Sequence, residues 1–156
     1  MKVDKIITTT IKMDIDIKGI TLLSREEYTA YKDLMSHDNW IYANWWLRSP
    51  GNSTGTVAVA HDNGWGLITD NIVRNRNAVR PTLLIANHNL NTGDNFILAD
   101  KEWTVISDTL AICNGIIGRY YFRFDWKDDN ANDYEASDVK KFLEEWAENN
   151  NIPYNK

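Results

Sequence analysis

Residues 45–51 read Trp-Trp-Leu-Arg-Ser-Pro-Gly, which puts two tryptophans, an arginine and a Pro-Gly pair side by side. Two adjacent tryptophans are costly to leave on an open surface because each exposes a large apolar area. Neighbouring side chains of an extended segment point to opposite faces. We therefore expect one of Trp45 and Trp46 to enter the core, while the other packs on the far side or lines a surface. The Pro-Gly pair predicts a turn directly afterwards.

An arginine lies in this motif, and a second one lies in Val-Arg-Pro at residues 79–81. Arg48 and Arg80 are each embedded in an apolar or turn-forming stretch. A guanidinium group carries five donors, so a buried or half-buried arginine can tie loops to the framework through several hydrogen bonds. We interpret both arginines as scaffold residues that bind backbone carbonyls or acidic groups.

Length and composition predict one folded domain that covers residues 1–156. Hydrophobic residues make up 43% of the chain, with 7 Trp and 7 Tyr, which is enough for a substantial core and unlike a disordered composition. The net charge of -5 argues against a general nucleic-acid binder, which needs a basic surface. Acidic residues outnumber basic ones from Asp94 onward, whereas residues 36–90 are near neutral.

Many short strand signals and two helix signals predict an α+β fold. Apolar side chains alternate with charged ones over residues 11–17, which is typical of a half-buried strand. Residues 78–85 predict a strand that carries Arg-Pro, and a proline there implies a sheet edge or a strand end. Ser24 starts a capping box, and Ser137 precedes a regular apolar helix stripe. We predict a twisted, mainly antiparallel sheet with two flanking helices.

Several stretches of the chain match motifs of one protein family: the tryptophan motif at 45–51, Val-Arg-Pro-Thr-Leu at 79–83, Asn-Thr-Gly-Asp at 91–94, Trp-Thr-Val-Ile-Ser at 103–107, and residues 134–143. Together they resemble the DUF6273 family of bacterial and prophage proteins, and the likeness covers roughly residues 20–150. It implies a C-type-lectin-like fold, with the segments in circularly permuted order relative to secreted relatives. The function of that family is not established, so the resemblance implies a fold and a phage context more than an activity.

The chain lacks the residue patterns of common catalytic and metal sites. The three histidines are scattered, and no paired cysteine, HExxH motif or phosphate-binding glycine loop is present. The single cysteine, Cys113, lies in an apolar run and is typical of a buried, inert thiol. Acidic residues over 125–135 could offer oxygen ligands to calcium, but a solvated acidic loop is the favoured interpretation. We predict no catalytic residue, no metal site and no cofactor.

Residues 56–72 predict a hairpin, with a tight turn at Asp-Asn-Gly 62–64 and a second turn at Asp-Asn 70–71. Its asparagines and arginines offer adaptable hydrogen bonds, and Trp65 offers an aromatic anchor with little local cover between two glycines. An ordinary polar hairpin face is an alternative interpretation that stays open. The predicted binding residues are Asn52, His61, Asn63, Trp65, Asn71, Arg74 and Arg76.

Three classes of function fit these observations. The first is a non-catalytic, phage- or prophage-associated binding protein that recognises a protein or a glycan. The second is a phage-encoded inhibitor of a host defence system, similar to an anti-CRISPR protein, that acts through protein–protein binding by its acidic C-terminal part. The third is an enzyme of unknown type, although the sequence shows no set of reactive groups that would support catalysis. We expect no direct nucleic-acid or membrane binding. Because no signal peptide is apparent, we expect the protein in the host cytoplasm or on a phage particle.

Overall fold

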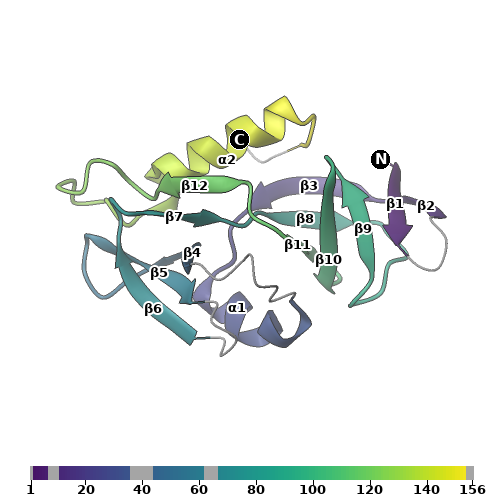
Figure 1. Ribbon diagram of the computed structural model, residues 1–156, viewed down its shortest axis with the longest axis horizontal. Helices are drawn as coiled ribbons and strands as arrows, with labels where there is room; N and C mark the ends of the chain where they lie inside the picture. Colours follow the sequence, from purple (N-terminus) through teal and green to yellow (C-terminus); the bar gives the residue numbers. More distant parts are fainter. Residues whose placement is uncertain (1, 7–10, 36–43, 62–66, 154–156) are drawn as a thin grey trace.

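The computed structural model describes residues 2–6, 11–35, 44–61 and 67–153 (Figure 1). One sheet contains β1 (Lys2–Ile6), β2 (Ile11–Asp14), β3 (Asp16–Thr21), β8 (Thr82–Ala86), β9 (Asn95–Leu98), β10 (Lys101–Ser107) and β11 (Leu110–Cys113). The other contains β4 (Asn44–Pro50), β5 (Thr56–His61), β6 (Leu67–Ile72), β7 (Arg76–Val79) and β12 (Gly118–Tyr121). The helices are α1 (Arg25–Tyr31), η1 (Lys32–Leu34), η3 (Tyr134–Ala136) and α2 (Asp138–Asn149).

The strand orders are β2-β1-β9-β10-β11-β8-β3 and β12-β7-β4-β5-β6. Within the described residues β4 and β7 run parallel, and the other strand pairs are antiparallel. The predicted α+β class with mainly antiparallel strands and two α-helices is therefore confirmed. The strands form two sheets, however, where the sequence predicted one. Figure 1 shows α1 and α2 on opposite sides of the molecule.

The predicted single strand over residues 11–17 is wrong. The chain forms β2 and β3, which are the two edge strands of the seven-stranded sheet and are separated only by the buried Ile15. Because one residue joins the two edge strands, the sheet bends enough to bring the end of β2 next to the start of β3. A bulge in β3 between Ile17 and Gly19 adds to this bending.

The predicted single strand over residues 78–85 is also wrong, because Arg80-Pro81 carries the chain from one sheet to the other. β7 ends before this pair and β8 begins after it. Proline has no N–H to donate to a strand ladder, so it fits the crossing point. Arg80 is fully buried there, where its Nε donates to the carbonyl oxygen of Cys113 at 2.7 Å. Its guanidinium carbon lies 5.1 Å from the centroid of the Trp45 ring. The predicted framework role of Arg80 is confirmed.

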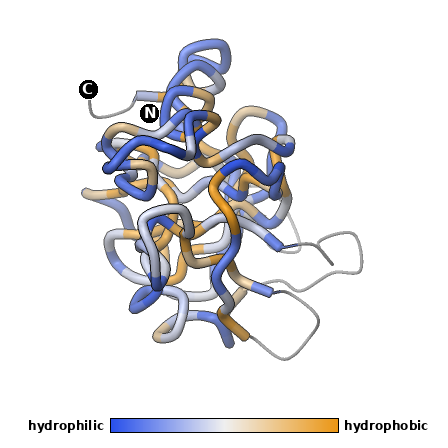
Figure 2. Tube along the Cα trace, turned by 90° about the vertical axis from the view of Figure 1, so that its left-hand side faces the viewer, coloured by the Kyte–Doolittle hydropathy of each residue, from blue (hydrophilic) through white to orange (hydrophobic). Residues whose placement is uncertain are grey.

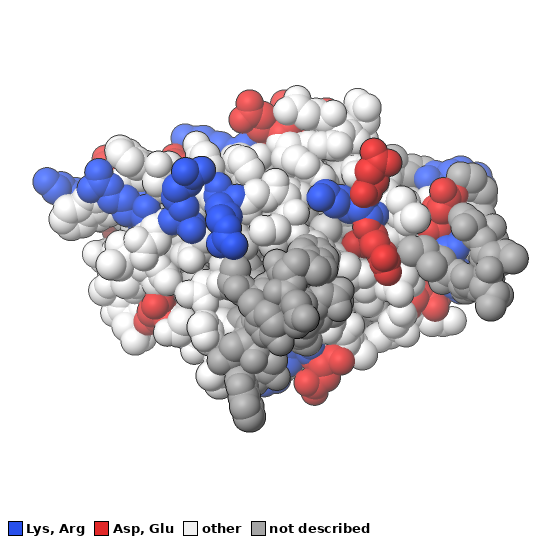
Figure 3. Space-filling model, viewed as in Figure 1, with Lys and Arg blue, Asp and Glu red and all other residues white. Residues whose placement is uncertain are grey.

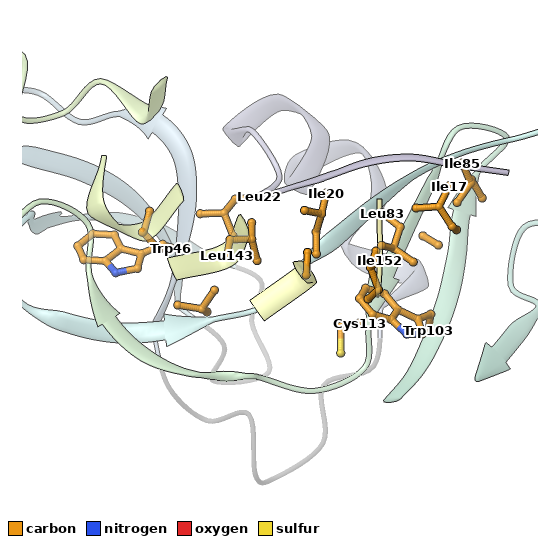
Figure 4. Packing of buried hydrophobic residues seen from close by; sticks show 14 of the residues in the cluster. Ile17, Ile20, Leu22, Trp46, Leu83, Ile85, Trp103, Cys113, Leu143 and Ile152 are labelled. Atoms are coloured by element: carbon orange, nitrogen blue, oxygen red, sulfur yellow. The ribbon is translucent and has the colours of Figure 1, made fainter. Parts of the chain in front are cut away.

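Both tryptophans of the 45–51 motif are fully buried, on opposite faces of β4. Trp46 belongs to the larger core, which includes Leu22 and Leu143 (Figure 4). Trp45 belongs to a second core and meets the Tyr28 ring edge to face at 5.3 Å. The sequence left open whether the second tryptophan packs on the far side of the strand or lines a surface. In the structure it packs on the far side. A strand with a core on each face explains why two adjacent tryptophans can both leave water.

The helix starts follow the predicted caps. Ser24 Oγ accepts from the Glu27 N–H at 3.0 Å, and the Ser24 N–H donates to Glu27 Oε1 at 2.8 Å. Ser137 caps α2, whose inner face buries Val139 and Leu143. The tube in Figure 2 is accordingly mostly hydrophobic (orange) toward the middle of the molecule and mostly hydrophilic (blue) at its outer turns.

The turn after β4 requires glycine. The Gly51 N–H donates to the Thr56 carbonyl oxygen at 2.9 Å. A Cβ on Gly51 would lie 2.3 Å from Thr56 Oγ1 and 2.9 Å from the Thr56 carbonyl carbon, so a side chain has no room.

The second turn predicted at 70–71 is wrong, because both residues lie in β6 and the chain turns at 73–75 instead. The tight turn predicted at 62–64 lies outside the described residues.

Candidate functional site

The turn after β6 and the segment after β12 are fastened together, although they lie far apart in the sequence. The carbonyl oxygen of Val73 accepts from the backbone N–H groups of Phe122 and Arg123, at 2.9 and 3.1 Å. Val73 and Phe122 are both fully buried, so this junction belongs to the core. It brings Arg74 beside Phe124, with 4.7 Å between the guanidinium carbon and the ring centroid.

A second arginine lies nearby because of the strand register. Tyr121 of β12 lies opposite Arg76 of β7 in the antiparallel pair. The guanidinium carbon of Arg76 lies 5.8 Å from the Tyr121 ring centroid. The Tyr121 and Phe124 rings meet edge to face at 5.2 Å, which joins the two arginine–ring pairs. Lys127 Nζ lies 5.4 Å from the Trp126 ring. We call these residues the arginine–aromatic surface: Arg74, Arg76, Tyr121, Phe124, Trp126 and Lys127.

Two rings of this surface are open to solvent. Phe124 is 52% exposed and Trp126 is 45% exposed. Single exposed apolar side chains are normal on proteins, but neighbouring aromatic ones beside cations are typical of interaction sites. Both rings line a shallow cavity of about 440 Å³ together with Arg74, Asp125 and Lys127. The arrangement therefore offers a partner both aromatic area and positive charge.

The positive charge of this region is not neutralised from within. Among the described residues, Arg74, Arg76, Arg119 and Lys127 take part in no salt bridge. Arg119 lies two residues before Tyr121 on β12 and therefore points to the same side of the strand. Figure 3 shows Lys and Arg side chains gathered on the part of the face formed by β7 and β12.

Three acidic residues near this surface bind other parts of the protein. Asp128 pairs with Arg123 at 2.7 Å, and Asp138 Oδ2 accepts from the Phe124 backbone N–H at 2.7 Å. Asp133 Oδ1 accepts from the Glu135 backbone N–H at the start of η3. The described residues contain no group of three or more His, Cys, Asp or Glu side chains placed to hold a metal ion. These carboxylates therefore fix the loop that presents Phe124 and Trp126.

The predicted binding residues separate into two groups. Asn52, Asn71 and Arg74 lie near one end of the β5–β6 hairpin, and Arg76 lies just beyond it on β7. His61 lies at the other end, where its Nδ1 is 2.5 Å from Asn44 Oδ1. Five strand residues separate the two ends, which corresponds to about 16 Å. His61 is therefore remote from the arginines, and the predicted residues do not form one continuous patch.

Two other predicted binding residues, Asn63 and Trp65, lie outside the described residues. The anchor role expected for Trp65 thus stays a prediction. Asn52 and Asn71 have local partners: the Asn52 N–H donates to Asp70 Oδ2 at 2.9 Å, and Asn71 Oδ1 accepts from Asn75 Nδ2 at 2.6 Å. Both asparagines therefore help to hold the turns next to the arginine–aromatic surface.

Sequence reasoning missed the aromatic members of this surface. It treated residues 125–135 as a solvated acidic loop. A signal was present, because Phe124 and Trp126 flank Asp125 at the start of a polar, acidic stretch. Their proximity to Arg74 depends on the tertiary junction at Val73 and could not be read from spacing.

Arg48 has the predicted framework role. Its Nη1 donates to the Leu22 carbonyl oxygen at 2.7 Å and to Glu27 Oε1 at 2.5 Å, and its side chain is 34% exposed. Burial of the Glu27 carboxyl disfavours its charge, but hydrogen bonds from Arg48 and Ser24 outweigh that effect and lower the pKa of Glu27. The pair links α1 to β4 and is already satisfied, which makes it structural.

Three other titratable groups with a raised pKa are buried or paired. Burial raises the pKa of Tyr134 to about 12 and also raises the pKa of the Cys113 thiol. Both groups are therefore neutral at physiological pH. Lys140 pairs with Glu135 at 2.8 Å and Glu144 at 3.5 Å, and the bond to Glu135 raises the pKa of Lys140. None of these groups is poised as a nucleophile or as a general base near neutral pH.

A larger, polar cavity of about 670 Å³ lies beside β10 and β11. Three of its lining side chains bond one another: Thr104 Oγ1 lies 2.7 Å from Asn95 Oδ1 and 2.6 Å from Asn114 Oδ1. None of the residues predicted to bind a partner lines it. We therefore place the candidate site on the arginine–aromatic surface.

No family model matches the chain. Comparison with curated proteins and with solved structures finds no match either. None of the described helices is long and apolar enough to cross a membrane. The function must therefore be argued from the site itself.

Proposed function

We propose that this protein is a non-catalytic binding protein that recognises another protein through the arginine–aromatic surface. One observation carries the proposal. Phe124 and Trp126 expose about half of their side chains beside cations that have no acidic partner among the described residues. Aromatic and arginine side chains dominate the energy of protein interfaces because they bury a large area and also direct hydrogen bonds.

The surface is held in place before any partner arrives. Phe122, two residues before Phe124, is buried against Trp46 with 5.4 Å between ring centroids. The backbone of Phe124 is held by Asp138, and the backbone of Arg123 by Val73. A preformed surface loses little conformational freedom on binding, which favours affinity.

The finer expectations belong to this proposal. We propose a C-type-lectin-like fold and a phage or prophage context, supported by the motif resemblance at residues 45–51 and by the position of β4 between β5 and β7. An inhibitor that mimics nucleic acid with an acidic face would need free carboxylates. Asp128, Asp133 and Asp138 are engaged in internal bonds, which leaves fewer free carboxylates in the C-terminal part for that alternative.

The test is to capture partners from a lysate of the cells that make the protein, using wild type and a variant that carries Phe124→Ser and Trp126→Ser. A matched control carries Leu34→Ser and Ile97→Ser, which change two other exposed apolar side chains. We expect one protein to be recovered in stoichiometric amount by wild type and control, and lost with the aromatic variant at unchanged melting temperature. Retention by the aromatic variant contradicts the proposal. Capture that survives protease treatment of the lysate would indicate a glycan and also contradicts it.

A further inference from the structure

We infer that the arginine–aromatic surface selects its partner through a carboxylate-rich peptide segment, an inference that rests on the proposed function. The first support is the state of the arginines. Arg74 and Arg76 contact ring faces and have no salt bridge among the described residues. Contact with a ring uses the face of a guanidinium group, and its N–H edge stays available for bidentate binding of a carboxylate.

Charge asymmetry is the second support. The chain has 17 Lys and Arg and 22 Asp and Glu. Arg74, Arg76, Arg119 and Lys127 lie together with one acidic residue, Asp125, which leaves 13 basic residues against 21 acidic ones in the rest of the chain. An acidic segment is thus attracted to this region and repelled by most of the remaining surface. Such a field orients a partner before contact and speeds its association.

The ring faces distinguish a peptide from a nucleic acid. Proteins that bind single-stranded nucleic acid stack successive bases on open aromatic faces. Here Phe124, Tyr121 and Trp126 each have a cation of the protein itself over one face. A long polyanion would also extend from the basic region onto the acidic remainder of the molecule, whereas a short acidic peptide can stay on the basic region. The observations therefore favour a peptide carboxylate over a phosphate backbone.

The exposed rings define what should accompany the acidic groups. Phe124 and Trp126 line the cavity together with Arg74 and Lys127. A segment that places an apolar side chain between acidic ones can fill this cavity while its carboxylates reach the cations at the rim. We expect acidic residues that flank one apolar residue to bind more tightly than acidic residues alone.

The test measures fluorescence anisotropy of a labelled peptide in which Asp and Glu flank a Leu. A matched peptide carries Asn and Gln in place of Asp and Glu, and a labelled oligothymidylate serves as the nucleic-acid probe. We expect the acidic peptide to bind at least about tenfold more tightly than the amide peptide. Its affinity should also fall several-fold between about 50 and about 200 mM salt, because the contacts are exposed charges.

A charge-matched pair of variants locates the site. Replacing Arg74 and Arg76 by Glu changes the net charge by the same amount as replacing Lys2 and Lys18 by Glu, two exposed lysines on the other sheet. We expect about a tenfold or greater loss with the arginine variant and less than about a twofold change with the lysine variant. Equal losses, equal binding of the amide peptide, or tighter binding of the oligothymidylate would each overturn the inference. If the acidic peptide fails while the lysate partner still depends on Phe124 and Trp126, the inference fails and the proposed function stands.

Discussion

The protein contains the same chemical pair, an arginine over an aromatic ring, in two different surroundings. Arg80 lies over Trp45 at 5.1 Å, fully buried between the sheets, and its Nε is bound to a backbone carbonyl. Arg74 lies over Phe124 at 4.7 Å, exposed, and without a salt bridge in the described part of the chain. The two distances are similar, so the ring contact does not distinguish Arg80 from Arg74. Burial and the remaining hydrogen bonds decide that one arginine stabilises the fold and leave the other free to bind a partner.

Arg48 stands between these extremes. It is half-buried, and it bridges the Leu22 carbonyl and Glu27. The three arginines therefore form a series in which the contribution to folding should fall as exposure rises. Three substitutions test this series, from the largest expected effect to the smallest.

Replacing Arg80 by Leu should have the largest effect on folding. The change leaves the Cys113 carbonyl without its donor inside the core and removes the cation from the Trp45 ring. We expect the free energy of unfolding to fall by about 3–5 kcal/mol. Urea unfolding followed by tryptophan fluorescence measures this loss. A decrease below about 1 kcal/mol would show that the buried pair is no more important to the fold than a surface contact.

Replacing Arg48 by Met should have an intermediate effect that depends on pH. Arg48 helps to lower the folded-state pKa of Glu27, so their interaction stabilises the fold at neutral pH and is lost as pH falls through that lowered pKa. We expect a loss of about 1–3 kcal/mol at neutral pH. The difference between wild type and variant should shrink in acid, below the ordinary Glu value of 4.5. Unfolding measured across this pH range checks the sign, and a difference that grows in acid would contradict it.

Replacing Arg74 by Leu should have the smallest effect on folding. The side chain is exposed and its visible interaction is the contact with Phe124. We expect the free energy of unfolding to change by less than about 0.5 kcal/mol. The same urea experiment used for Arg80 provides the comparison. A loss similar to that of the Arg80 variant would make Arg74 a framework residue and remove the distinction between the two regions.

Local rules predicted part of the fold accurately. The caps at Ser24 and Ser137 follow from hydrogen bonds between residues three positions apart, and both are present. The opposite positions of Trp45 and Trp46 follow from the two-residue period of a strand. The framework roles of Arg48 and Arg80 followed from their apolar and turn-forming neighbours.

Predictions that depended on continuity along the chain failed. Apolar and charged residues alternate in the sequence across residues 11–17, but β2 and β3 form the two opposite edges of the same sheet. The run through Arg80-Pro81 likewise divides between two sheets. Hydrophobic periodicity predicts which face of a strand a side chain occupies, but it does not predict which strand pairs with that segment.

Two of the six residues of the arginine–aromatic surface could be predicted from the sequence. Arg74 and Arg76 were expected to bind because they are polar groups near predicted turns. Phe124 and Trp126 were not, because their role depends on segments that are distant in sequence. The Val73 carbonyl, which accepts from both Phe122 and Arg123, is the contact that brings the two halves together.

The amino-acid sequence by itself determined the caps and the strand alternation at Trp45 and Trp46. Each of these depends on atoms within a few residues, where backbone geometry leaves few choices. Only the tertiary structure decided that Arg80 is enclosed while Arg74 faces solvent, and that Phe124 lies beside Arg74. The physical reason is that burial and long-range contact depend on strand order and on the packing of two cores, which local geometry does not specify.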